Sequence, residues 1–220
     1  QAIAVLLALK EAGEVEDGAL VVAPAGLLTN WERELARFAP SLSVHSQYGP
    51  GRRLRAADVV LTTYETLARD GEKLSGRAWS VAVLDEAHLV KNPDARRSRA
   101  AKALKAKMRL ALTGTPVENN LAELWSVFDF VLPGYLGTLA RFASEYRNPI
   151  EVGRDRERAE RLRRLTAPFL LRRLKTDKAI APDLPEKVVI EESAELTAEQ
   201  AALYGAAVSA GLASIEASEG

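Results

Sequence analysis

The sequence has no cysteine, which excludes a disulfide framework and every metal site built on thiolates. It has only two histidines, His45 and His88, and neither belongs to the H-E-x-x-H spacing of a zinc hydrolase. No apolar run approaches the roughly 20 residues that span a bilayer, so we expect no membrane partner. The lack of cysteine fits a reducing compartment, and we therefore expect an intracellular protein, cytoplasmic or associated with the nucleoid.

Net charge is also missing, because 30 basic residues balance 30 acidic residues. No bulk charge therefore draws the chain toward nucleic acid or a membrane. The balance is not uniform, since residues 154–178 hold ten Lys and Arg against four Asp and Glu, whereas residues 179–220 hold one against eight. A basic segment followed by an acidic tail is a local feature that the fold or the function has to explain.

Apolar residues make up 47% of the sequence and gather in short runs between longer periodic segments. Four such runs lie at 19–23, 58–64, 79–85 and 108–114. Their apolar residues are consecutive rather than alternating, which is typical of strands covered on both faces. The segments between them, such as 26–38, have helical spacing. This alternation predicts an α/β fold, with a mainly parallel sheet and helices on both faces.

After Pro133 helical segments dominate, and a helical extension is expected to follow the sheet. The stretch APDLPEK at 181–187 has two prolines close together and reads as a linker. We therefore expect a first domain at 1–150, a helical basic brace segment at 151–180, and a linker leading into a second domain at 181–220.

An apolar run leads straight into two adjacent acids, Asp85 and Glu86, in the stretch VAVLDEAHLV. In an open parallel sheet, ligands bind beyond the carboxyl ends of the strands, and the run at 79–85 delivers Asp85 there. Magnesium prefers one or two carboxylates together with waters and phosphate oxygens. A second carboxylate can take a proton from an attacking water. The pair therefore suits a magnesium-bound nucleoside triphosphate, although two solvated acids that end a strand would have the same sequence.

Two other strand candidates end in short hydroxyl side chains, in LALTGTP at 110–116 and VLTTY at 60–64. Each is an ordinary strand-to-turn signal when it is taken alone. Together with the acids, they place Asp, Glu or Thr at the ends of three strands along one predicted edge.

Several longer stretches carry a family resemblance: VLDEAHLVKNP, RLALTGTPVENNLAELWSVFDFVLPGYLG and FLLRRLKTDK, with LVVAPAGLLTNWERELARF and DVVLTTYETL upstream. In this order and spacing they resemble the Swi/Snf-type family of superfamily-two helicase-like ATPases. DEAH alone is a weak signal, whereas TGTPVENNLAELW is highly specific. The resemblance covers nearly the whole chain. It implies the first of two RecA-like lobes of an ATP-driven translocase on double-stranded DNA, with ATP and magnesium as cofactors.

The resemblance also implies roles for individual residues. Asp85 would hold magnesium through water, Glu86 would activate the hydrolytic water, and His88 would link the nucleotide to the DNA-facing motifs. A coupling motif would comprise Thr113, Gly114, Thr115, Glu118 and Asn119. Two DNA-binding motifs would comprise Gly26, Leu27, Asn30 and Trp31, and then Thr62, Thr63 and Tyr64.

Some of these residues have plainer explanations. Glu118 and Asn119 stand where a helix begins, and helix capping alone would account for them. Trp31, Trp79 and Trp125 are widely spaced among apolar neighbours, so we expect core packing rather than stacking on bases. The family often has a serine where Gly26 stands, and the glycine would lack one phosphate contact that the serine hydroxyl could make.

The sequence departs from the family pattern most clearly at the phosphate loop, since no G-x-x-x-x-G-K-[ST] motif occurs in it. The family places this loop just before a segment like QAIA, so Gln1 is expected to follow the loop within a longer protein. The second lobe, with its arginine finger, is also expected outside these residues. We therefore expect the 220 residues alone neither to bind nor to hydrolyse ATP.

The whole protein is thus predicted to be an ATPase that moves along duplex DNA and displaces or remodels bound protein, with the second lobe as its partner in cis. A strand-separating helicase is the alternative within enzymes. A module that binds DNA or a partner without hydrolysis is the alternative from another class, and the intact acidic pair argues against it.

Overall fold

The computed structural model describes residues 1–114, 120–173, 192 and 195–218, with side chains described as far as residue 211. It divides into two compact units, Gln1–Phe169 and Leu170–Gly220. The first unit contains β1 (Ala19–Ala23), β2 (Val44–Ser46), β3 (Val59–Thr63), β4 (Ala78–Leu84) and β5 (Lys105–Ala111). Its first helices are α1 (Ala2–Glu11), α2 (Ala25–Phe38), α3 (Tyr64–Arg69), α4 (Gly71–Ser75), the short 3-10 helix η1 (Ala87–Val90) and α5 (Arg96–Lys102).

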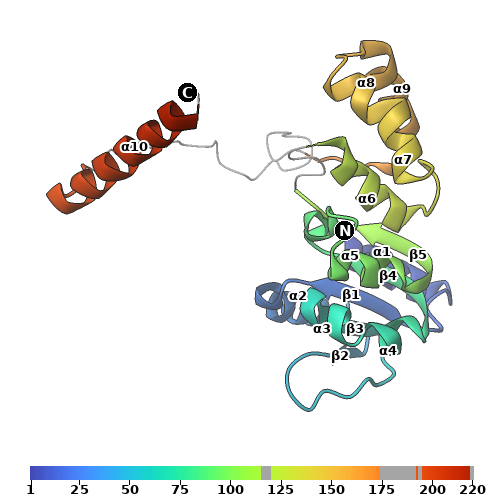
Figure 1. Ribbon diagram of the computed structural model, residues 1–220. Helices are drawn as coiled ribbons and strands as arrows, with labels where there is room; N and C mark the ends of the chain where they lie inside the picture. The colour runs from blue at the N-terminus through green and yellow to red at the C-terminus, as the bar shows by residue number, and fades with distance from the viewer. Residues whose placement is uncertain (115–119, 174–191, 193–194, 219–220) are drawn as a thin grey trace. The chain divides into compact units, whose positions relative to one another are not determined.

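A run of further helices follows the sheet in the first unit (Figure 1). They are α6 (Leu121–Val131), α7 (Leu139–Phe142), the π-helical turn η2 (Ala143–Arg147), α8 (Asn148–Glu151), α9 (Arg156–Thr166) and the 3-10 turn η3 (Ala167–Phe169). The second unit contains α10 (Ala198–Ser218). Thr197 and Gln200 cap its start reciprocally, since the Gln200 amide donates to Thr197 Oγ1 at 3.3 Å and the Thr197 amide donates to Gln200 Oε1 at 3.1 Å.

The strands form one sheet in the order β2-β3-β1-β4-β5, and every pair in it is parallel. This confirms the predicted fold class, a parallel sheet followed by a helical extension. Residues of β1, β3 and most of β4 are buried on both sides, as their consecutive apolar residues predict. Because β1 pairs in parallel with both β3 and β4, the residues that follow these three strands lie at the same carboxyl edge of the sheet.

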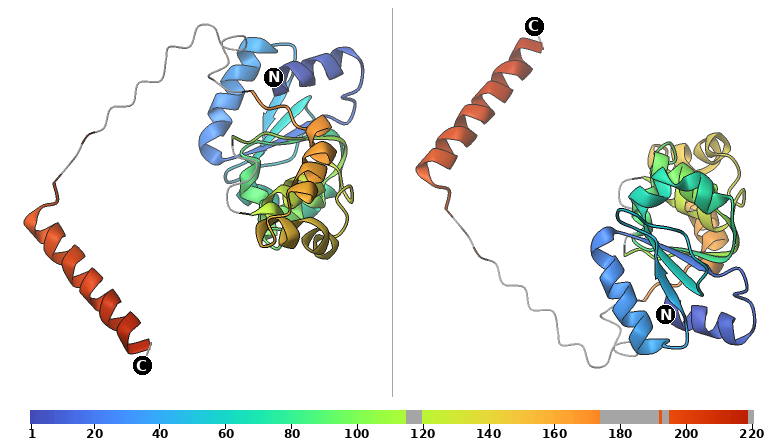
Figure 2. Two further views of the ribbon diagram at one scale, coloured as in Figure 1. Left: turned by 90° about the horizontal axis from the view of Figure 1, so that it is seen from above. Right: turned by 90° about the horizontal axis from the view of Figure 1, so that it is seen from below.

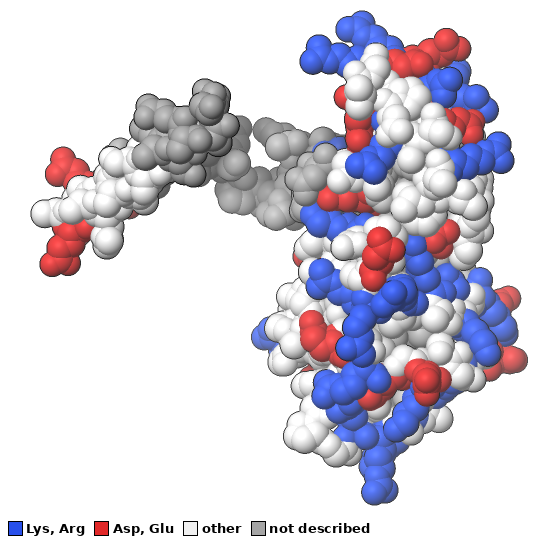
Figure 3. Space-filling model, viewed as in Figure 1, with Lys and Arg blue, Asp and Glu red and all other residues white. Residues whose placement is uncertain are grey.

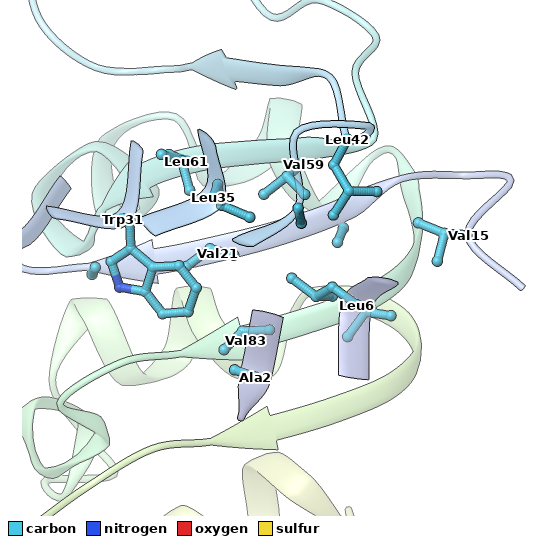
Figure 4. Packing of buried hydrophobic residues seen from close by; sticks show 14 of the residues in the cluster. Ala2, Leu6, Val15, Val21, Trp31, Leu35, Leu42, Val59, Leu61 and Val83 are labelled. Atoms are coloured by element: carbon cyan, nitrogen blue, oxygen red, sulfur yellow. The ribbon is translucent and has the colours of Figure 1, made fainter. Parts of the chain in front are cut away.

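Alternate strand residues point to opposite faces of the sheet, and each face has its own core. Ala19, Val21 and Ala23 of β1 pack with α1 and α2 on one face (Figure 4). Leu20 and Val22 pack on the other face, with α3, α4, α5 and the end of α6. The helices therefore cover both faces of the sheet, as the views from two further directions show (Figure 2).

A third apolar cluster lies in the helical extension and joins α6 to α7, η2 and α9. Leu124, Trp125 and Phe128 of α6 belong to it, together with Phe142 and Tyr146. Phe130, near the end of the same helix, is fully buried in the core on the α3 face of the sheet. Helix α6 therefore belongs to two cores at once. Trp31, Trp79 and Trp125 are all buried, which confirms the expectation of core packing.

The fifth strand begins earlier than the sequence indicated, at Lys105 rather than at residue 108. Lys105 and Lys107 are exposed, and within the described residues β5 pairs on one side only, with β4. Lysines are common on exposed edge strands, which explains why the apolar run alone placed the start of this strand too late. None of the described helices combines the length and the apolar character that crossing a membrane requires.

The basic segment at 154–178 is described as far as Arg173, and its helical part is α9. Arg158 pairs with Asp155 at 3.3 Å and Arg163 pairs with Glu160 at 3.2 Å, both three residues apart. Lys, Arg, Asp and Glu side chains mix on the face that Figure 3 presents. This part of the segment is therefore a solvated, ion-paired helix face, which contributes little to stability. The domain boundaries expected at residues 150 and 180 stay a prediction.

Candidate functional site

The acidic pair follows β4 at the carboxyl edge of the sheet, where neighbouring strands hold its backbone. The Asp85 amide donates to the Val22 carbonyl at 2.8 Å, which continues the pairing of β4 with β1 by one residue. On the other side, the Ala87 amide donates to the Leu112 carbonyl at 2.8 Å. The two residues between these bonds are therefore presented at the edge by the sheet itself and not by a free loop.

The Asp85 carboxylate accepts two hydrogen bonds from within the protein. Trp31 Nε1 donates to Oδ2 at 2.8 Å, and the Glu86 amide donates to Oδ1 at 2.9 Å. Trp31 lies on α2, and its ring packs in the apolar core shown in Figure 4. Hydrogen bonds to a charged group are about twice as strong as neutral ones. The orientation of this carboxylate therefore depends on these two protein contacts.

The main-chain carbonyl of Asp85 is held as well, by the Tyr64 hydroxyl at 2.6 Å. Only 1% of Tyr64 is exposed. Burial raises the pKa of Tyr64 well above its ordinary range, and the nearby charges of Asp85 and Glu86 add to this rise, against an opposing effect of Arg97. The hydroxyl therefore keeps its proton at any physiological pH and acts as a hydrogen-bond donor.

Glu86 has a left-handed backbone, with φ 51° and ψ 51°, which is uncommon for a residue other than glycine. Such conformations persist where surrounding contacts determine them, and they gather at functional sites. The Glu86 side chain is 41% exposed, so solvent can reach it. His88 Nδ1 lies 3.2 Å from Glu86 Oε2, within ion-pair distance, although the geometry falls short of a hydrogen bond. The structure thus brings Asp85, Glu86 and His88 together.

The coupling motif is described only in part. Thr113 and Gly114 follow β5 at the same edge of the sheet, where Thr113 is partly buried and Gly114 is exposed. Thr115, Glu118 and Asn119 lie outside the described residues. Asn120 caps α6, because its Oδ1 accepts from the Ala122 amide at 3.0 Å. The role of the motif stays a prediction.

The two upstream motifs divide into exposed and buried members. Gly26 and Asn30 are exposed on α2, Leu27 is half-buried, and Trp31 is buried. Thr62, Thr63 and Tyr64 are all buried.

The buried hydroxyls have partners within the protein. Thr62 Oγ1 donates to the Gln47 carbonyl at 2.9 Å, and Thr63 Oγ1 caps α3 by accepting from the Thr66 amide at 3.0 Å. Their contact with DNA stays a prediction, and in this conformation only Gly26, Leu27 and Asn30 offer surface for it.

Sequence reasoning missed a set of contacts that fasten the segment after the acidic pair to α5 and α6. The Val90 carbonyl accepts from Ser126 Oγ at 2.7 Å and from Ser98 Oγ at 3.0 Å. Lys91 Nζ lies 3.3 Å from Glu123 Oε1, and the Glu123 side chain is 9% exposed. A serine inside the buried stripe of α6 was the available signal, because a buried hydroxyl needs a partner.

The carboxylate oxygens of the acidic pair can serve magnesium as ligands in one way only. Within the described ranges, no group of three or more His, Asp and Glu side chains could hold a metal ion by itself. Each oxygen of the Asp85 carboxylate already accepts one hydrogen bond. Magnesium usually keeps several waters and takes one or two carboxylates together with phosphate oxygens. Asp85 therefore fits an ion held through water and by phosphate, and does not fit an ion enclosed by protein ligands.

Comparison with known proteins gives results of three kinds. The model of the SNF2-related domain family matches residues 1–220. The chain is 47% identical over 212 residues to "Putative ATP-dependent helicase/translocase YwqA" of Bacillus subtilis, a match that covers 93% of this chain and 23% of that protein. It is 39% identical over 188 residues to "TATA-binding protein-associated factor mot1" of Schizosaccharomyces pombe, a match that covers 77% of this chain and 10% of that protein.

A solved structure with a similar fold is the "SWI2/SNF2 ATPase core in complex with dsDNA" of Sulfolobus solfataricus. Its TM-score is 0.77 at 41% identity, and the match covers 98% of this chain and 46% of that chain. This chain therefore spans less than half of the solved ATPase core and about a quarter of the Bacillus protein.

Proposed function

Because this chain belongs to the SNF2-related domain family, whose model matches residues 1–220, we propose that its whole protein is an ATP-dependent translocase on double-stranded DNA. It moves along the duplex and displaces or remodels bound protein. The described fold is that of the first RecA-like lobe of such an ATPase. The observation that carries the proposal is the Asp85–Glu86 pair, held rigidly at the carboxyl edge of the sheet and connected there to residues of both upstream motifs.

In this proposal the acidic pair performs the hydrolytic step. Magnesium-bound ATP supplies the phosphoryl group to be transferred. Asp85 would hold magnesium through water, since each oxygen of its carboxylate already accepts one hydrogen bond from the protein. Glu86 takes the proton from the attacking water with its solvent-accessible carboxylate. His88, next to Glu86, and the coupling motif at Thr113, Gly114, Thr115, Glu118 and Asn119 connect the nucleotide to the DNA side.

The DNA contact is proposed at the start of α2 and at the junction of β3 with α3. Gly26 and Asn30 reach the phosphate backbone directly, with Leu27 beside them. A helix start presents free backbone amides, which suits an anionic phosphate. Trp31, Thr62, Thr63 and Tyr64 shape this surface from beneath. The likeness to an ATPase core solved with double-stranded DNA supports this assignment.

We also propose that the cradle for the ATP phosphates lies elsewhere in the whole protein. A phosphate loop surrounds the β- and γ-phosphates with backbone amides and a lysine, and these 220 residues contain no such motif. A second RecA-like lobe with an arginine finger would act in cis, and the linker at 181–187 would lead into it. The domain division at 150 and 180, and a location in the cytoplasm or at the nucleoid, remain parts of this proposal.

The 220 residues alone should therefore bind magnesium-ATP with no useful affinity and should not hydrolyse it. Titration calorimetry with magnesium-ATP on these residues and on the full-length protein measures the difference. The full-length protein serves as the matched control, since it contains the same Asp85. Micromolar binding by the 220 residues would show that the nucleotide site is misplaced.

Binding of the full-length protein to duplex DNA should be salt-sensitive and largely independent of sequence. Contacts to phosphates release counterions, so the logarithm of the affinity falls linearly with the logarithm of salt concentration. Titrations of several unrelated duplexes at three salt concentrations measure the slope. A strong preference for one sequence with a flat salt response would contradict a translocase.

Two other functions are separated from this one by simple assays. A strand-separating helicase would release one strand of a partial duplex in the presence of ATP, whereas a translocase displaces a bound protein and leaves the duplex paired. A module that binds without hydrolysis would show no DNA-stimulated ATPase activity at all. The intact acidic pair favours hydrolysis over the second alternative.

A further inference from the structure

Two side chains hold Asp85 from opposite faces of the sheet. Trp31 projects from α2, within the core on the α1 and α2 face, and binds the Asp85 carboxylate at 2.8 Å. Tyr64 begins α3, within the core on the other face, and binds the Asp85 carbonyl at 2.6 Å. One residue is therefore fixed at its side chain by one layer of helices and at its main chain by the other.

We propose that Trp31 and Tyr64 are positioning residues, through which contact of DNA with α2 and with the β3–α3 junction sets the geometry of the Asp85–Glu86 pair for ATP hydrolysis. The proposal rests on the function proposed above and deepens it. It names the atoms that connect the DNA side of the lobe to its hydrolytic side.

The path on the α2 side is short. Asn30 is exposed and precedes Trp31 directly, and Gly26 is exposed one turn earlier on the same helix. A phosphate held at these residues pulls on α2, and a helix moves as a rigid element over one turn. Trp31 is 8% exposed and its indole N–H is directed to Asp85. A shift of α2 therefore shifts the donor that orients the carboxylate.

The path on the α3 side is equally direct. Thr63 ends β3 and caps α3, and Tyr64 is the first residue of that helix. Thr62, one residue before Thr63, donates to the carbonyl of Gln47, which directly follows β2, and this bond ties the end of β3 to the end of β2. Thr62, Thr63 and Tyr64 are buried in this conformation, so DNA acts on this junction by shifting it, and such a shift reaches the Asp85 carbonyl through the single side chain of Tyr64. Burial raises the pKa of Tyr64, so its hydroxyl keeps the proton that this bond needs.

The effect passes from Asp85 to Glu86 through one hydrogen bond. The Glu86 amide donates to Asp85 Oδ1 at 2.9 Å, and Glu86 has the left-handed backbone described above. Rotation of the Asp85 carboxylate removes the acceptor that helps to hold this uncommon conformation. The general base then loses its position, although neither Trp31 nor Tyr64 touches the nucleotide.

The test uses the full-length protein with Trp31→Phe, which keeps an aromatic ring in the core and removes the N–H donor. We expect DNA-stimulated kcat for ATP to fall by about 10- to 100-fold, the range for a hydrogen bond to a charged group. The KM for ATP and the Kd for duplex DNA should change less than about twofold, because Trp31 touches neither ligand. A purely structural role would instead lower stability and affect all three quantities together.

Trp79→Phe is the matched control. Trp79 is fully buried, and its Nε1 donates to the Leu74 carbonyl at 2.8 Å, so the substitution also removes an indole hydrogen bond from the core. Trp79 lies near the start of β4, six residues before Asp85, which corresponds to about 20 Å along a strand. It should lower thermal stability to a similar degree and leave DNA-stimulated kcat within about twofold of wild type.

Tyr64→Phe is a second, independent variant, and it carries the test if Trp31→Phe does not fold. Its loss of kcat should be smaller, about 3- to 10-fold, because the bond is to a neutral carbonyl. Both bonds end on Asp85, so the double variant should lose less than the product of the two single losses.

The outcomes separate the two proposals. If DNA stimulates the ATPase of the wild-type protein and both variants keep full kcat, the positioning role is overturned and the translocase stays in place. Loss of DNA affinity in Trp31→Phe, with kcat intact at saturating DNA, would make Trp31 part of the DNA surface and would also overturn it. A wild-type protein without DNA-stimulated ATPase would overturn the translocase, and this inference with it.

Discussion

Glu86→Gln in the full-length protein should abolish ATP turnover while nucleotide affinity stays nearly unchanged. Glutamine keeps the size and the left-handed position of the residue, but it cannot take a proton from water. Loss of a positioned general base lowers the rate by about 10²–10⁴. DNA-stimulated ATPase activity and the Kd for magnesium-ATP, measured on both proteins, check the two halves of this expectation.

Glu72→Gln provides the control, since Glu72 lies exposed in the first turn of α4, away from the carboxyl edge. It removes the same charge and should leave turnover unchanged. Turnover at the wild-type rate in Glu86→Gln would exclude this residue as the base, whereas equal losses in both variants would point to a change in net charge rather than in chemistry.

The largest loss of stability from the smallest change is expected at Gly18, just before β1. Its φ is +77°, a region that costs other residues about 1–2 kcal/mol. A Cβ there would also lie 2.7 Å from the backbone carbonyl oxygen of Ala57, which has to move. Such crowding adds about 1–3 kcal/mol. Gly18→Ala should therefore lower the free energy of unfolding of the first unit by about 2–5 kcal/mol.

Gly13→Ala separates the two causes. Gly13 has nearly the same φ, +76°, and nothing lies within 4 Å of a Cβ built there, so only the backbone cost of about 1–2 kcal/mol remains. Denaturant unfolding followed by tryptophan fluorescence reports on the first unit, because Trp31, Trp79 and Trp125 all lie in it. Equal losses for the two alanine variants would mean that the chain near Ala57 relaxes without cost.

The architecture was largely readable from the sequence because its signals are local. Consecutive apolar residues at 19–23 and 79–84 predicted buried parallel strands, and these strands form the centre of the sheet. The start of β5 was misjudged because Lys105 and Lys107 interrupt the apolar signal on an exposed edge. The order of the strands in the sheet depends on contacts between distant segments, and no local pattern encodes it.

The acids of the site could be predicted from the sequence, whereas the contacts that hold them could not. Asp85 and Glu86 could be identified because two acids end an apolar strand, and a ligand edge is a property of the fold class. The bond from Trp31 to Asp85 joins residues 54 positions apart, and the apolar neighbours of that tryptophan predicted core packing without indicating a partner for its N–H. The contacts of Ser98 and Ser126 with the Val90 carbonyl could not be predicted either, because their acceptor is a main-chain atom, which has no sequence signature.

Helix α6 has a consequence for how the molecule opens. Leu124, Trp125 and Phe128 anchor it in the helical extension, and Phe130 anchors it under the sheet. A fluctuation that separates the helical extension from the sheet exposes the part of α6 that packs in the extension, while Phe130 keeps the end of the helix in the core of the sheet. We therefore expect the extension to open before the sheet does, and we expect α6, which belongs to both cores, to link the free energies of the two openings.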